Sequence, residues 1–246
     1  MKLDYPKVSV VISTFDRPKM LREAIASVLA QDFRDWELIV VDDCSDTAKA
    51  VAREFMAEGR FQGHRVRVLS TDAPSGYQCV PKNVGVLHSR GSYVAYLDDD
   101  NLWDTDHLAT CVDTIERLGT DAVYSRWRYT GDGPFTDKEF PHVPMTREVA
   151  QKLIQGPANN IVDSSSLLHS RASVLGCLGN RMWSPRVRRF GDWDLVARML
   201  NEGLTFAPTG KVTFTYRWHG QNLQLTRAAK QSDVTLQRWS PEMVAP

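Results

Sequence analysis

The amino-acid sequence predicts an α/β fold, with a mostly parallel central sheet and helices on both of its faces. Short apolar runs typical of buried strands alternate with amphipathic helical patterns through residues 1–101. Strands separated by helices pair in parallel, because each helix carries the chain back to the edge where the next strand begins. With 246 residues, 42% of them hydrophobic, the chain can bury a core of this kind as one unit.

Runs rich in apolar residues mark the predicted strands of the first half. They occupy residues 8–13, 36–41, 66–69 and 93–97. Amphipathic helices are predicted between them. The first helix follows Asp16, which can cap it, and has Pro18 in its first turn. The second helix ends near Gly59, and a third, short helix covers residues 84–89.

The second half of the sequence is less regular. Apolar residues at helical spacing predict helices at residues 106–118 and 192–202. Residues 131–144 are rich in Gly, Pro and Asp and are predicted to form a loop. Strands are predicted at residues 122–129, 164–169 and 211–218.

Charge, cysteine content and hydropathy narrow the class of protein. Lys plus Arg and Asp plus Glu each number 30, so no overall charge draws the chain to nucleic acid or to an anionic membrane. The four cysteines form no CxxC pair and are expected to be free thiols in a reducing compartment. No run approaches the ~20 apolar residues of a membrane span, and we expect no signal peptide. We therefore expect a cytoplasmic protein, with peripheral membrane attachment left open.

Polar and acidic residues gather where three of the predicted strands end. Parallel strands place these ends along one rim of the sheet, which is where open α/β sheets bind ligands. Carboxylates so close together are stable only if cations or hydrogen-bond donors lie among them. The residues are Ser13, Thr14 and Asp16 after the first strand, Asp42 and Asp43 after the second, and Asp98, Asp99, Asp100 and Asn101 after the fourth.

The run Asp98–Asp100 contains an Asp-x-Asp pair directly after a buried strand. Such a pair can hold a hard divalent cation and a ribose hydroxyl, and the cation would neutralise charge on a departing diphosphate. The alternative is a solvated turn before the next helix. Asp42 can likewise accept the imide N–H of a uracil base, or cap the helix that begins near Thr47.

These segments are similar to glycosyltransferase family 2, which has the GT-A fold. The similarity rests on VSVVISTFDRPKMLREAIASVLAQDFRDWELIVVDDCS, on KNVG and on GSYVAYLDDDN. The later segments SSSLLHSRASVL and SPRVRRFGDWD resemble inverting, spore-coat polysaccharide members of that family, and YRWHGQN resembles a segment that closes many family sites. The resemblance implies a metal-dependent, inverting transfer of sugar from a nucleoside-diphosphate donor, and the expected donor is a UDP-sugar.

The same resemblance implies a role for individual residues. Thr14 and Asp42 would hold the nucleoside, Asp99 the ribose, and Asp100 a divalent metal, Mn²⁺ or Mg²⁺. Asp192, in FGDWD, would be the catalytic base. Further donor-binding candidates are Asp16 and Lys82, and further metal ligands are Asp98 and His219. Residues 1–101 would form the nucleotide-sugar-binding half, residues 102–225 the acceptor-binding half of the same domain, and residues 226–246 a tail.

Arginines interleaved with aromatic residues are a second feature of the acceptor half. They occur within residues 126–129 and 181–190 and suit phosphates, stacked bases or sugar faces. Surface arginines beside core aromatics are the alternative. The acceptor candidates are Arg189, Trp183 and Asp194, and a structural role is the alternative for Asp194. A sugar, glycan or other hydroxyl acceptor is expected, and an anionic or nucleic-acid-like acceptor stays open.

Two other classes of function are alternatives to sugar transfer. A nicotinamide dehydrogenase needs a glycine-rich turn after the first strand, and STFDRP contains no glycine. The spore-coat members use an arginine against uracil in the loop before KNVG, and TDAPSGYQCVP has none. A non-catalytic nucleotide-sugar-binding module remains the alternative to an enzyme.

Overall fold

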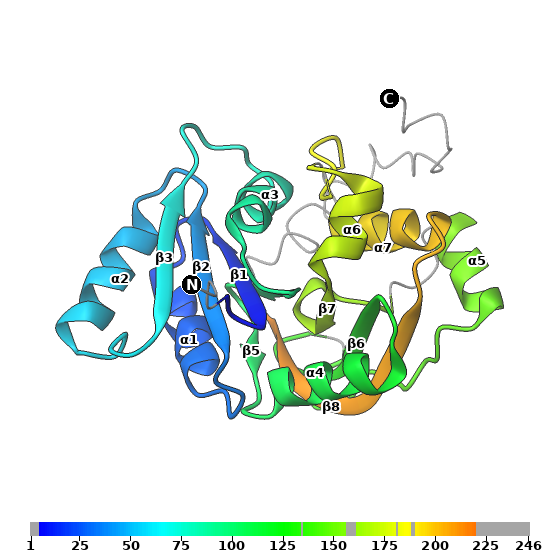
Figure 1. The fold of residues 1–246 in the computed structure, drawn as a ribbon. Helices are drawn as coiled ribbons and strands as arrows, with labels where there is room; N and C mark the ends of the chain where they lie inside the picture. The colour runs from blue at the N-terminus through cyan, green and yellow to red at the C-terminus, as the bar shows by residue number, and fades with distance from the viewer. Residues whose placement is uncertain (1–4, 134, 156–160, 181, 188–189, 220–246) are drawn as a thin grey trace, which may run out of the picture.

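The structure is a computed structural model that describes residues 5–133, 135–155, 161–180, 182–187 and 190–219. Within these residues an eight-stranded sheet runs through the molecule in the order β3-β2-β1-β4-β7-β6-β8-β5 (Figure 1). The predicted α/β fold class is confirmed, and the predicted tail lies outside the described residues.

The first four strands form the parallel part of the sheet. Every residue of the first two is buried, because helices cover both faces, and this explains why their sequences are mainly apolar. The four strands are β1 (Val8–Thr14), β2 (Trp36–Asp42), β3 (Arg65–Ser70) and β4 (Tyr93–Asp98).

Helices lie on both faces of this parallel part (Figure 1). Helices α1 (Pro18–Leu29) and α2 (Thr47–Ala57) share a hydrophobic cluster with Ile12 on one face. Helix α3 (Cys79–His88) packs on the other face, in a cluster that contains Val11. Adjacent residues of β1 therefore enter different cores, as the alternation of a strand requires.

The second half of the chain extends the same sheet with mixed pairing. Strand β7 is antiparallel to both β4 and β6, β6 is parallel to β8, and β5 is antiparallel to β8. The mixed part is thus continuous with the parallel part. The elements are β5 (Leu102–Trp103), α4 (His107–Leu118), β6 (Ala122–Gly131), α5 (Arg147–Gln155), the 3₁₀ turn η1 (Ser164–Ser166), β7 (Leu167–Ser170), α6 (Arg171–Leu178), α7 (Gly191–Asn201) and β8 (Phe206–Trp218).

Several elements differ from the sequence prediction. Helices α5 and α6 were not predicted, because they are short and α6 has almost no apolar periodicity. The available sequence signal for each helix was a capping residue before its first turn. The Thr146 hydroxyl accepts from the Val149 N–H, and the Ser170 hydroxyl accepts from the Ser173 N–H. The prediction that Asp16 caps α1 is wrong, because Arg17 is the N-cap residue.

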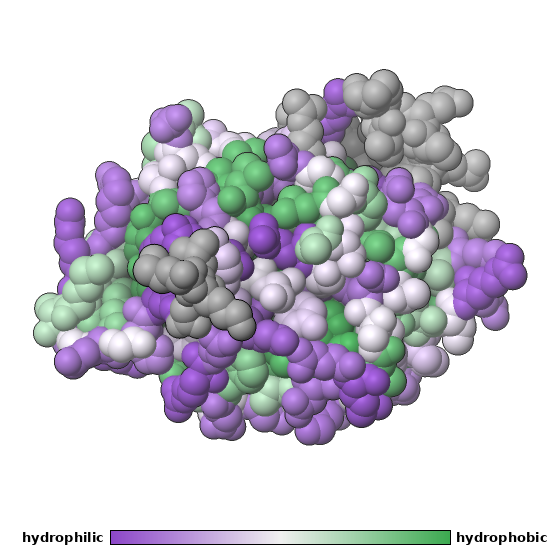
Figure 2. All heavy atoms as spheres, viewed as in Figure 1, coloured by the Kyte–Doolittle hydropathy of each residue, from purple (hydrophilic) through white to green (hydrophobic). Residues whose placement is uncertain are grey.

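Helix α4 shows how the exposed side of this scaffold is built. Its buried residues include Leu108, Cys111 and Ile115, while Asp113 and Glu116 are exposed. Figure 2 shows hydrophilic residues along the lower edge of the molecule, where α4 lies in Figure 1. Among the described residues, no helix combines the length and the apolar character needed to cross a bilayer.

Candidate active site

The ends of β1 and β4 bring predicted site residues together on the rim of the sheet. Ser13 is the register partner of Asp98. The Thr14 hydroxyl donates a hydrogen bond of 2.7 Å to Asp99. The Arg17 guanidinium donates to Asp99 at 3.1 Å and to Asp100 at 2.9 Å. A hydroxyl and a guanidinium thus supply the donors that the clustered carboxylates require.

Asp100 also meets a residue from the far end of the described chain. The imidazole Nε2 of His219, which follows β8, lies 3.2 Å from an Asp100 carboxylate oxygen. Burial raises the pKa of Asp100, but the His219 hydrogen bond and the Arg17 charge outweigh it, and the pKa is held below the ordinary value. Asp100 is therefore ionised at neutral pH.

Asp100 and His219 fit part of a divalent metal site. They offer a carboxylate oxygen and an imidazole nitrogen, which Mn²⁺ accepts in one coordination shell. The described part of the chain contains no group of three or more His, Cys, Asp and Glu side chains that could hold an ion. Diphosphate oxygens and water would have to complete the shell, as is usual for ions bound with substrate phosphates.

Asp98 and Lys82 contact each other in the structure. The two oxygens of Asp98 accept from Lys82 Nζ and from the Ser164 hydroxyl, both at 2.8 Å. Lys82 is fully buried, and its Nζ lies 4.3 Å from the centroid of the Trp183 ring. Lys82 therefore holds Asp98 instead of a donor nucleotide, and each oxygen of Asp98 already accepts a hydrogen bond from within the protein.

Asp42 takes the capping role that the sequence left open. It is fully buried, and its oxygens accept from the Ser45 N–H, the Ser45 hydroxyl and the Ala48 N–H at 2.6 to 2.7 Å. These bonds satisfy the start of α2, so the prediction that Asp42 reads a uracil base is not supported by its geometry. Asp43 binds the loop at Ser75, while Asp16 is exposed on the rim.

Two of the three acceptor candidates have structural roles. Trp183 has no exposed surface and packs edge-on against Tyr96, with 4.9 Å between ring centroids, so it cannot contact an acceptor. Asp194 forms an ion pair of 2.8 Å with Arg198 within α7 and is a structural residue. Arg189 lies outside the described residues.

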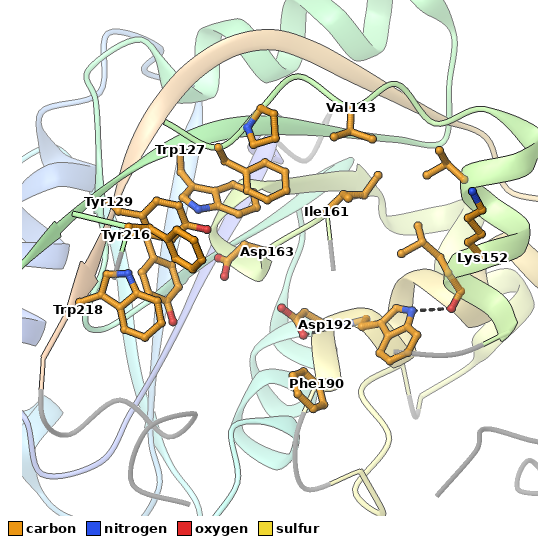
Figure 3. A pocket seen from close by; sticks show the side chains of 16 residues that line it. Trp127, Tyr129, Val143, Lys152, Ile161, Asp163, Phe190, Asp192, Tyr216 and Trp218 are labelled. Atoms are coloured by element: carbon orange, nitrogen blue, oxygen red, sulfur yellow. Dashed lines mark hydrogen bonds between the residues drawn. The ribbon is translucent and has the colours of Figure 1, made fainter. Parts of the chain in front are cut away.

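A cavity of about 630 Å³ opens beyond the rim, between β6, β8, α5 and α7. Aromatic side chains form one wall, and two carboxylates, Asp163 and Asp192, face the space (Figure 3). Asp192 lies in the first turn of α7, and burial raises its pKa to about 6. A carboxylate of this pKa suits a general base near neutral pH.

Sequence reasoning missed Asp163. Burial raises the pKa of this carboxyl well above its ordinary value, and the charges of Asp98 and Asp192 add to the effect. The available signal was its position directly after the apolar pair Ile161–Val162, which resembles the other strand-end acids.

The arginines at residues 126–129 do not line the cavity. Arg128 makes a two-pronged ion pair with Asp104, at 2.7 and 2.8 Å, and Arg126 pairs with Glu139 at 3.1 Å. Trp127 and Tyr129 alternate with them along β6 and do line the cavity. This separation matches the alternative of surface arginines beside buried aromatics.

Comparison with known proteins assigns the chain to a family. The sequence profile described as "Glycosyl transferase family 2" matches residues 9–174, more than half of the chain, and the chain belongs to this family. Succinoglycan biosynthesis protein ExoW of Rhizobium meliloti is 31% identical over 122 residues, which are 48% of this chain and 37% of ExoW. The GalNAc(5)-diNAcBac-PP-undecaprenol beta-1,3-glucosyltransferase of Campylobacter jejuni is 36% identical over 97 residues, 39% of this chain and 30% of that protein. The matches thus span less than two thirds of these relatives.

Two solved structures share the fold. The S. aureus TarS structure in complex with UDP-GlcNAc matches with a TM-score of 0.67 and 18% identity, over 89% of this chain and 60% of TarS. The mannosyltransferase PcManGT from Pyrobaculum calidifontis, in complex with GDP-Man and Mn²⁺, also has a TM-score of 0.67 and 18% identity, over 92% of this chain and 61% of PcManGT. The likeness identifies the GT-A fold.

Proposed function

We propose that the chain is a metal-dependent, inverting glycosyltransferase that moves a sugar from a nucleoside-diphosphate donor to an acceptor hydroxyl. The donor that we expect is a UDP-sugar. The observation that carries the proposal is the position of Asp192 in the cavity beyond the rim that holds Asp99 and Asp100. Family membership and the nucleotide-sugar complexes of TarS and PcManGT support it.

The rim residues would hold the donor. Asp99, fixed by Thr14, would accept hydrogen bonds from the ribose hydroxyls. Asp100 and His219 would bind the metal, and Arg17 would place a further positive charge beside them. A divalent ion bound there supplies positive charge that stabilises the leaving diphosphate.

Asp192 would act on the acceptor. Its carboxylate takes the proton from the acceptor hydroxyl as the oxygen attacks the anomeric carbon. The carbon–oxygen bond to the diphosphate breaks on the opposite side, so the configuration inverts and the nucleoside diphosphate leaves with the bonding electron pair. The aromatic wall excludes water that would otherwise compete with the acceptor.

A nucleotide-binding panel tests the donor side. We expect UDP with Mn²⁺ to raise the melting temperature more than GDP or dTDP, with metal required for the full effect. Asp100→Asn should remove the metal-dependent part, because it removes the charged ligand, whereas exposed Asp113→Asn should leave it unchanged. Greater stabilisation by GDP would reassign the donor base, and an undiminished effect in chelator would remove the metal from the proposal.

The rate should depend on pH through Asp192. Only the ionised carboxylate accepts a proton, and burial raises its pKa to about 6. We therefore expect kcat/KM for the acceptor to fall as the pH drops through about 6 and to level off at higher pH. The measurement is nucleoside diphosphate release at saturating metal with a panel of methyl glycosides as acceptors. An inflection in the ordinary range of an exposed carboxyl would contradict the assigned environment of Asp192.

A further inference from the structure

Asp163 is a carboxylate in the acceptor cavity that the donor rim does not use. It caps the 3₁₀ turn η1, where its Oδ1 accepts from the Ser165 N–H at 2.8 Å. This bond fixes the carboxyl on the cavity wall between Tyr216 and Asp192 (Figure 3). The two carboxyls are close enough that the charge of Asp192 adds to the raised pKa of Asp163.

The wall beside Asp163 is a continuous aromatic surface. In the β6–β8 register, Tyr129 pairs with Tyr216 and Gly131 with Trp218. The ring centroids of Tyr129 lie 5.6 Å from Tyr216 and 6.2 Å from Trp218. A Cβ at Gly133 would collide with the Trp218 ring, and a Cβ at Gly131 would collide with the Trp218 backbone carbonyl, so these glycines permit the position of Trp218. Such a wall buries the apolar face of a sugar ring.

The ionisable residues other than tyrosine in the described part of the cavity lining are mainly acidic. They are Lys152, Asp163 and Asp192. Lys152 Nζ is already paired with Glu148 at 2.7 Å, as expected for successive turns of α5. An anionic group entering the cavity would meet the Asp192 carboxylate in a low-dielectric space, and the raised pKa of Asp163 shows that the cavity disfavours a further negative charge. Sugar hydroxyls can form hydrogen bonds to both carboxyl groups.

We infer that Asp163 determines acceptor specificity: the cavity takes an uncharged sugar unit that stacks on the aromatic wall, directs its nucleophilic hydroxyl to Asp192 and donates a neighbouring hydroxyl to Asp163. This inference rests on the proposed function, because it assigns the cavity to the acceptor. It selects a neutral saccharide over the anionic or nucleic-acid-like acceptor that the sequence left open.

Binding of small glycosides tests the inference without donor or metal. The probes are methyl glycosides of glucose, galactose, mannose and N-acetylglucosamine, compared with methyl glucuronide by ligand-observed NMR titration. We expect at least one neutral glycoside to bind more tightly than the glucuronide. In Asp163→Asn the Oδ1 can still cap η1, but the amide nitrogen cannot accept a hydrogen bond from a sugar hydroxyl, so that neutral glycoside should bind about tenfold more weakly. The substitution should also reduce the difference in affinity between that neutral glycoside and the glucuronide.

Matched variants separate this inference from the proposed function. Asp113→Asn removes a charge from the exposed face of α4 and should change no glycoside affinity. In turnover, Asp163→Asn should raise the acceptor KM far more than it lowers kcat. Unchanged affinity in Asp163→Asn, tighter binding of the glucuronide by the wild type, or no binding of any neutral glycoside would overturn the inference. Nucleotide binding and turnover test the proposed function independently of glycoside affinity.

Discussion

Replacing Asp192 with asparagine should lower turnover by about 10²–10⁴-fold, the usual contribution of a positioned general base. An acceptor hydroxyl is a poor nucleophile until its proton is being removed, and asparagine cannot remove it. Donor binding should persist, because the proposed donor contacts come from Thr14, Asp99 and Asp100 on the rim, and not from α7. The measurement is kcat beside the nucleotide dissociation constant.

Asp194→Asn is the matched control for this prediction. Asp194 is in the same helical turn, but its carboxylate is paired with Arg198 at 2.8 Å and does not line the cavity. The substitution should lower stability and leave the kcat of folded protein nearly unchanged. Near-normal turnover in Asp192→Asn, or a collapse confined to Asp194→Asn, would move the base to another residue.

The parallel half of the fold was predictable from sequence because its signal is local. Strands β1 and β2 are buried on both faces, so they read as apolar runs whatever their neighbours are. The meeting of Thr14 with Asp99 follows from the same argument, since parallel strands end on one rim. Their hydrogen bond joins residues that are far apart in the chain but adjacent in the sheet.

The direction of individual side chains was not predictable, because it depends on distant packing. Trp183 is fixed by Asn83, whose amide side chain bonds to both its backbone carbonyl and its N–H, at 2.7 and 3.0 Å. That contact turns an apparent acceptor residue into a core residue. Asp163 reaches the cavity because the segment it begins pairs with β4 and β6, and no local pattern specified that pairing.

Replacing Lys82 with methionine should destabilise the protein by about 3 kcal/mol, the lower end for a buried pair that loses one partner. Lys82 has no exposed surface, and its ammonium donates to Asp98 at 2.8 Å and to Gln78 at 2.7 Å. Methionine fills a similar volume beside Trp183 but leaves the Asp98 charge uncompensated. The lower end applies because the Asp98 side chain keeps 22% exposure and its bond from Ser164.

Thermal and denaturant unfolding of two further variants would identify the cause of that loss. The surface pair Lys7–Glu116 supplies the control: both side chains are more than a third exposed, so Lys7→Met should cost less than about 1 kcal/mol. The double variant Lys82→Met/Asp98→Asn should recover much of the stability lost in Lys82→Met, because the unpaired charge is gone. If the double variant were as unstable as the single one, the loss would come from packing around Trp183, and the ion pair would not be what holds Asp98 beneath the rim.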